Sequence, residues 1–225
     1  TTGMLLAKHG HFTWGDSAKA SYDRVIEQTN LVEDWLSQNR TVPAFKGHRL
    51  DADVKAGFLG KLRGALAATG SDWPKMPVFD VIDDEATLAF LERNDLDELA
   101  RSGVATPDHV IRIKAHPMLL SRDDIEIDGD VDGLAKRIRD FSETYSAYFD
   151  EFSKTAEQSK TMLSPLPKVV WAPGVGLIGV GASLKEARTV TDLAEQNIRV
   201  MADGVANGGF TPVQAQDLFD MEYWS

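Results

Sequence analysis

A glycine-rich stretch in the last third of the sequence constrains the fold more than any other feature. Residues 165–187 read PLPKVVWAPGVGLIGVGASLKEA, an apolar run followed by spaced glycines and then by helix-forming residues. Ser183 and Glu186 have the spacing of a capping box, so a helix is expected to begin at Ser183. The stretch therefore predicts a strand, a glycine turn, a second strand-like piece and a long helix.

The segment GVGLIG at residues 174–179 also matches the G-x-G-x-x-G pattern of dinucleotide-binding loops. In those loops the helix opens on the motif, so that its N-terminus faces the pyrophosphate. Here the helix is expected to start later, at Ser183, and residues 194–204 read as helix where an acidic residue after a strand would be needed. We therefore predict a turn between two strands and no NAD bound at this loop.

Segments with helical spacing alternate with strand-like segments along the chain, which predicts the α/β class. The aromatic residues between Phe141 and Phe152 are expected to serve packing, and residues 40–50 read as a loop between two parts of the chain. Helices are expected from Ser17, over 51–70, over 84–103 with a break near Asn94, from Asp130, from Ser183 and after Pro212; strands are expected at 4–7, 76–83 and 109–119.

Composition limits the classes of function. The 225 residues carry a net charge of −11, from 35 acidic and 24 basic side chains, which disfavours nucleic-acid partners and anionic membranes. The absence of cysteine excludes disulfides and thiolate metal ligands. No apolar run approaches the roughly 20 residues that span a bilayer, and no segment resembles a signal peptide. A cytoplasmic protein without a membrane or nucleic-acid partner is expected, and self-association into a homo-oligomer is left open.

Two histidines near the N-terminus form a candidate metal site. Residues 8–16 read KHGHFTWGD, and in an extended chain the side chains of His9 and His11 point to the same face. Zinc needs three or four nitrogen, oxygen or sulfur ligands, and no other histidine stands at ligand spacing from this pair. Spacing alone therefore leaves two interpretations open, part of a metal site or a hydrogen-bonded pair at a strand end.

The stretch LLAKHGHFTWGDSAKASYDRVIE, residues 5–27, resembles the end of a class II aldolase/adducin domain. More narrowly, it resembles the bifunctional rhamnulose-1-phosphate aldolase/short-chain alcohol dehydrogenases, and the resemblance continues through TPDHVIRIKAHPM, PLPKVVWAPGVGLIGVG and LFDMEYWS. It implies a layered α/β/α fold of the class II aldolase type. It also implies that His9 is a zinc ligand, that further ligands come from a His-x-His element upstream of this chain, and that His11 is not a ligand.

The resemblance implies a parent enzyme that cleaves a ketose 1-phosphate of the rhamnulose 1-phosphate type to dihydroxyacetone phosphate and an aldehyde, with zinc stabilising the enediolate. An NAD-dependent short-chain dehydrogenase domain of the parent would then process the aldehyde.

Residues 1–40 are expected to end the aldolase-like domain, and residues 41–225 to form an α/β middle module before the dehydrogenase domain. Both ends of the chain read as cuts inside a longer protein, so this fragment is expected to catalyse neither reaction alone. The alternative is a non-catalytic, aldolase-like binding or scaffold module.

Residues 3–30 and 169–196 share one order of elements, a strand, a glycine turn, a short apolar piece and a long helix. The pairs that coincide are Gly10 with Gly176, Gly15 with Gly181, Ser17 with Ser183 and Lys19 with Lys185, while His9 falls opposite Val175. The second stretch is interpreted as a degenerate copy of the aldolase-like layer that has lost the metal ligand. Convergence on a common α/β unit is an equally compatible explanation.

A second candidate site lies in DHVIRIKAHP, residues 108–117. If this segment is a strand, Arg112, Lys114 and His116 share one face, and His109 lies on the other. A basic face in an acidic protein can bind a sugar phosphate or a carboxylate, and Asp108 could orient a neighbouring histidine. The alternative is the solvated face of an edge strand.

Overall fold

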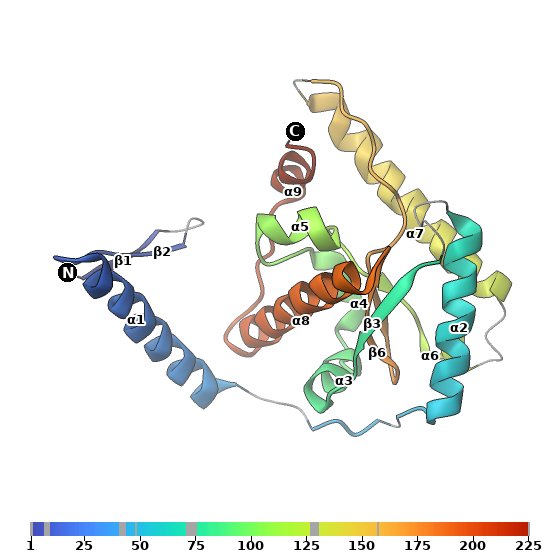
Figure 1. The fold of residues 1–225 in the computed structure, drawn as a ribbon, viewed down its shortest axis with the longest axis horizontal. Coiled ribbons are helices and arrows are strands. Elements are labelled where there is room, and N and C mark those ends of the chain that lie inside the picture. Colours follow the sequence, from blue (N-terminus) through green and yellow to red (C-terminus); the bar gives the residue numbers. More distant parts are fainter. Residues whose placement is uncertain are drawn as a thin grey trace. The chain divides into compact units, whose positions relative to one another are not determined.

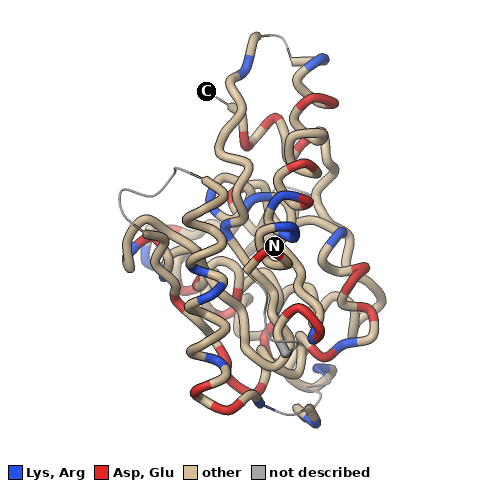
Figure 2. The backbone as a smooth tube through the Cα atoms, turned by 90° about the vertical axis from the view of Figure 1, so that its right-hand side faces the viewer, with Lys and Arg blue, Asp and Glu red and all other residues tan. Residues whose placement is uncertain are grey.

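The computed structural model describes residues 2–6, 10–40, 44–47, 49–70, 76–126, 131–156 and 158–224. The chain divides into two compact units, one formed by Thr1–Thr41 with Ala206–Gly208 and the other by Val42–Val205 with Gly209–Ser225. Acidic and basic residues are interspersed along the backbone of the chain (Figure 2). Among the described residues, no helix is both long enough and apolar enough to cross a membrane.

The first unit is a β-hairpin followed by a long helix (Figure 1). Strands β1 (Gly3–Leu6) and β2 (Gly10–Thr13) pair antiparallel, and α1 covers Ala18–Asn39. The helix begins where expected, because the Ser17 side chain accepts a hydrogen bond of 3.1 Å from the Ala20 backbone N–H. Every residue of α1 is described and none is buried, so the unit buries little apolar surface of its own.

The second unit is built on a four-stranded mixed sheet with the order β3-β6-β5-β4. Its strands are β3 (Val78–Ile82), β4 (Met118–Leu119), β5 (Val169–Ala172) and β6 (Gly176–Gly181). β6 pairs antiparallel with both neighbours, whereas β4 and β5 run parallel. The glycine-rich stretch thus forms the two central strands, and its turn joins two strands as predicted.

Helices cover both faces of this sheet, which confirms the layered α/β/α prediction (Figure 1). Val170, Ile178 and Val180 point to one face and pack against α2 (Ala52–Thr69) and α7 (Val131–Phe152). Val169, Trp171 and Leu177 point to the other and pack against α8 and its neighbours. The helices of that layer are α3 (Glu85–Leu91), α4 (Leu96–Ser102), α5 (Pro107–Ile113), α8 (Leu184–Ala206) and α9 (Ala215–Glu222); α6 (Arg122–Glu126) and the 3₁₀ turn η1 (Ser153–Thr155) complete the unit.

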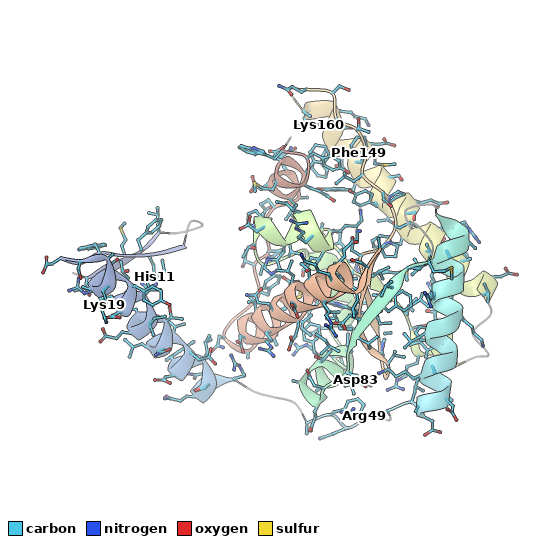
Figure 3. All side chains as sticks on the ribbon, in the orientation of Figure 1. His11, Lys19, Arg49, Asp83, Phe149 and Lys160 are labelled. Atoms are coloured by element: carbon cyan, nitrogen blue, oxygen red, sulfur yellow. The ribbon has the colours of Figure 1, made fainter. Side chains whose placement is uncertain are left out.

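The aromatic stripe of α7 packs against α9, which confirms the prediction that these residues serve packing. Figure 3 shows Phe149 of α7 beside α9, and its ring lies 5.1 Å from that of Tyr223, centroid to centroid. Phe219 stacks on Tyr223 at 4.7 Å. These contacts form a third apolar cluster, which fixes the C-terminal helix against α7.

The strand predicted over residues 109–119 is wrong. Residues 107–113 form α5, and only Met118–Leu119 are extended. Thr106 in extended conformation and Pro107 at the first helical position are the start signals of a helix, and they outweigh the alternation of apolar residues. The helix ends at Lys114, a residue with a φ of 64°.

Candidate functional site

The predicted zinc ligand, His9, lies outside the described residues. His11, which follows in β2, bonds through Nε2 to Gln28 Oε1 of α1 at 2.6 Å, so it ties the hairpin to the helix. Thr13 does the same, donating to the Ser21 carbonyl at 2.7 Å. Among the described residues, no group of three or more histidine and acidic side chains lies close enough to hold a metal ion.

The hairpin and helix of the first unit have a counterpart in the second, with a constant shift of 166 positions and no gap. β1, β2 and α1 correspond to β5, β6 and α8. The strand registers are identical: Gly3 pairs with Thr13 and Leu6 with Gly10, as Val169 pairs with Gly179 and Ala172 with Gly176. The predicted correspondence of residues 3–30 with 169–196 is therefore confirmed for element order and register.

Equivalent glycines make equivalent contacts in the two units. A Cβ built on Gly15 would lie 3.0 Å from the backbone nitrogen of Ser21, and one on Gly181 would lie 2.6 Å from that of Ala187, the equivalent residue. Glycine thus lets each helix turn back closely onto its own hairpin. The counterpart of His9, Val175, is fully buried in the apolar core, as predicted for its position in the second copy.

The strand face predicted for Arg112, Lys114 and His116 does not form, because residues 107–113 are helical and the helix ends before Lys114. Asp108 is exposed in the first turn of α5, where its charge suits the helix N-terminus. His109 is buried between Thr106 Oγ1 at 2.5 Å and Gln196 Oε1 at 2.7 Å, so its ring joins α5 to α8. Lys114 and His116 line one cavity, and Arg112 and Lys114 line another.

Lys114 is the centre of a buried polar cluster that sequence reasoning missed. Its ammonium donates to the Ser164 carbonyl at 2.6 Å and lies 3.4 Å from the centre of the Tyr145 ring. The Tyr145 hydroxyl donates to Glu222 Oε1 at 2.7 Å and accepts from the Tyr223 hydroxyl at 2.6 Å. The cluster therefore joins the end of α5 to α7 and α9.

Burial shifts the proton equilibria of this cluster. Burial raises the pKa of Glu222, although the Tyr145 hydroxyl and the Lys114 charge act in the opposite direction. Burial and the neighbouring Glu222 carboxylate raise the pKa values of Tyr145 and Tyr148, so both phenols stay protonated. Burial lowers the pKa of His116 against the effect of its hydrogen bond to the Ala100 carbonyl, so this ring is neutral at pH 7.

Two cavities meet at Lys114, which lines both. The larger, of about 1060 Å³, lies between the α3–α4 connection, the β4 region and α7, and His116 lines it. The smaller, of about 500 Å³, is lined by Arg112 and by Ser183 and Lys185 at the start of α8. Among the described residues, the buried polar atoms without a hydrogen-bond partner are His116 Nδ1, the Tyr148 hydroxyl and Glu222 Oε2, and each belongs to a residue lining one of these cavities.

A family model described as "Aldolase class II, second domain" matches residues 53–225, which is most of the chain. The chain belongs to the class II aldolase second-domain family. The match covers the sheet of the second unit, its two helical layers and both cavities, and it supports the aldolase-like fold expected from the sequence.

A relative of this class II aldolase second-domain chain is known in Bacillus subtilis (strain 168), where it is named "Uncharacterized oxidoreductase YuxG". The two are 25% identical over 231 residues, which is 98% of this chain and 32% of the relative. The chain therefore spans about a third of the relative's length. No solved structure matches the chain significantly.

The sequence held one signal for the polar cluster. Tyr145 and Tyr148 stand in the aromatic stripe of α7, and a buried tyrosine hydroxyl needs a partner. Those partners lie far away in the sequence, on α9 and at the end of α5. Only the tertiary fold shows that these residues meet.

Proposed function

We propose that this chain is part of a bifunctional enzyme. The longer protein would cleave a ketose 1-phosphate of the rhamnulose 1-phosphate type to dihydroxyacetone phosphate and an aldehyde, in a zinc-dependent reaction. A fused NAD-dependent short-chain dehydrogenase would then act on the aldehyde. The observation that supports the proposal most is that a segment of an aldolase family makes up about a third of a relative named an oxidoreductase.

Within this proposal, the first unit would place His9 as one zinc ligand. The residue precedes Gly10, the first residue of β2, and the hairpin is held by its register and by the bonds of His11 and Thr13 to α1. The described residues do not form a zinc site by themselves. Further ligands would have to come from another part of the longer protein, so no catalytic step is assigned to this chain alone.

The test compares the longer protein with the 225-residue chain, using rhamnulose 1-phosphate and a coupled assay for dihydroxyacetone phosphate. We expect product from the longer protein, none from the chain, and loss of activity in the His9→Ala variant of the longer protein. The matched control His11→Ala should keep activity within a few-fold, because it removes only the contact with Gln28. A longer protein that folds but yields no product would favour the non-catalytic scaffold.

A further inference from the structure

The larger cavity lies where α/β proteins bind ligands. Leu120 and Ser121, which follow β4, and Pro173, which follows β5, line it, together with residues 114–117 before β4, so it extends along β4 and includes the carboxyl ends of the two parallel strands. In open α/β sheets, ligand sites form outside the carboxyl ends of strands, where connecting loops supply side chains. Its volume of about 1060 Å³ is ample for a small metabolite.

The correspondence between the two units relates the position of this cavity to the turn of the first unit. Pro173 is the counterpart of residue 7, and Val175 is the counterpart of His9. The cavity of the second unit therefore adjoins the turn that corresponds to the proposed zinc-binding turn of the first. Val175 is buried in the core, so the second copy has an apolar side chain at the position of His9, and the cavity lies next to this turn.

Basic side chains outnumber acidic ones in the lining of the cavity. In a protein with a net charge of −11, the described residues lining the cavity carry more cations than acids. The cations are Arg93, Arg101, Lys114, Arg122 and Arg137, and the acids are Glu92, Asp97 and Asp140. Arg93 is paired with Asp95, Arg122 with Glu92 and Arg137, through its Nε, with Asp124.

Two of the arginines keep donors for a ligand. Within the described part of the chain, Arg101 has no ion-pair partner at the end of α4. Arg137 of α7 donates to Asp124 through Nε at 2.9 Å, and its terminal nitrogens make no hydrogen bond to a described residue. Two such groups suit the doubly charged phosphate of a phosphomonoester better than a single carboxylate, because arginine binds phosphate oxygens in a forked geometry.

Apolar side chains of the same cavity can pack against the carbon skeleton of such a ligand. Leu91, Leu96, Met118 and Phe141 line the cavity with apolar surface, and the neutral ring of His116 lies among them. We propose that this cavity binds a small phosphomonoester through Arg101 and Arg137, as a metal-free second site distinct from the proposed zinc site. The correspondence with the zinc-binding turn rests on the proposed function, whereas the cavity and its arginines do not.

The test is a titration of the 225-residue chain with glycerol 3-phosphate in the presence of a metal chelator, followed by histidine-ring NMR. The His116 signal, assigned with His116→Gln, should shift saturably, whereas that of His11 in the first unit should not move. Glycerol should cause no shift, and inorganic phosphate should bind more weakly. Because the chelator removes zinc, the result is independent of any aldolase activity.

Variants complete the test. The double change Arg101→Gln/Arg137→Gln should weaken binding of glycerol 3-phosphate by about tenfold or more, since it removes both charged groups that would bind the phosphate. Arg199→Gln is the matched control, because Arg199 is exposed on α8 and does not line the cavity. If the double variant does not fold, Arg101→Gln alone carries the comparison. Absence of a saturable His116 shift up to about 10 mM, or equal weakening by Arg199→Gln, would overturn the proposal.

Discussion

Glu222 is a carboxyl group that the fold buries beside Tyr145, with one oxygen bonded and the other, Oε2, without a partner among the described residues. Burial raises its pKa above the ordinary value of 4.5. A raised pKa means that the folded state holds the proton more tightly, so this contribution to stability is complete below about 4.5 and is lost as the pH rises through the folded-state pKa.

We therefore expect Glu222→Gln to be about as stable as the natural chain at pH 4 and to become relatively more stable as the pH rises to 7. Urea unfolding at a series of pH values measures the difference. Glu143→Gln, an exposed change on α7, is the control and should show no such trend. A stability difference between the two proteins that stays constant or narrows with rising pH would contradict the raised pKa of Glu222.

Lys114 combines a buried ammonium with a backbone that only glycine adopts freely. Its φ of 64° and ψ of 171° cost a residue with a Cβ about 1–3 kcal/mol. Lys114→Gly should therefore be more stable than Lys114→Ala by about 1 kcal/mol. Where φ is negative, alanine is instead the more stabilising of the two residues. Both variants lose the hydrogen bond to the Ser164 carbonyl, so the difference between their free energies of unfolding, measured by chemical denaturation, reports the backbone strain at position 114. Equal stabilities would show that the strain is relieved elsewhere.

At the scale of elements, the close approach of α8 to β6 depends on a glycine. A Cβ on Gly181 would lie 2.6 Å from the Ala187 nitrogen, a contact that requires the helix to move. Gly181→Ala should destabilise the second unit by about 1–3 kcal/mol. Gly57→Ala is the matched control, because its Cβ would meet no atom within 4 Å on the exposed side of α2, and it should stabilise the protein by about 0.5–1 kcal/mol. Similar urea midpoints for the two variants would disprove the packing argument.

Elements with strong local signals could be predicted from the sequence. The glycine turn, the helix after Ser183 and the helix after Ser17 all follow from caps and periodicity, and they lie where expected. Ser183 accepts from the Glu186 backbone N–H at 3.2 Å, and the Glu186 carboxylate accepts from the Ala182 N–H at 2.8 Å. Such signals act over three or four residues, so one sequence is enough to read them.

The candidate site could be predicted only in part. Residues 109–113 alternate in polarity like a strand, yet the short helix α5 buries His109, Val110 and Ile113, which are spaced as one helical face. The error placed Arg112, Lys114 and His116 on one face, whereas Arg112 and His116 line different cavities and Lys114 lines both. The cluster of Lys114 with Tyr145 and Glu222 depends on contacts across long sequence distances, which periodicity does not reveal.

At the scale of the whole molecule, the same hairpin–helix plan occurs twice in different surroundings. In the second unit, β6 and β5 have further strands on their outer edges, and the sheet is covered on both faces. In the first, the two-stranded sheet and α1 leave large apolar side chains exposed, with Leu5 79% and Trp35 53% accessible. Surfaces of this kind are typical of contacts with further polypeptide.

Because the apolar core lies in the second unit, residues 42–225 should fold without residues 1–41. We expect this truncated chain to unfold in one cooperative transition, with a melting temperature close to that of the full chain. Calorimetry on both proteins measures this. Loss of cooperative unfolding in the truncated chain would show that the first unit is needed to stabilise the second.

Metal analysis tests most directly whether His9 belongs to the proposed zinc site of a longer aldolase-type protein. The longer protein, purified without chelator and measured by mass spectrometry, should carry about one zinc per chain. Its His9→Ala variant should lose the metal, and the isolated 225-residue chain should bind zinc only weakly, since one ligand of the set is too few. Tight zinc in the His9→Ala variant, or a longer protein that folds and contains no zinc, would contradict the account.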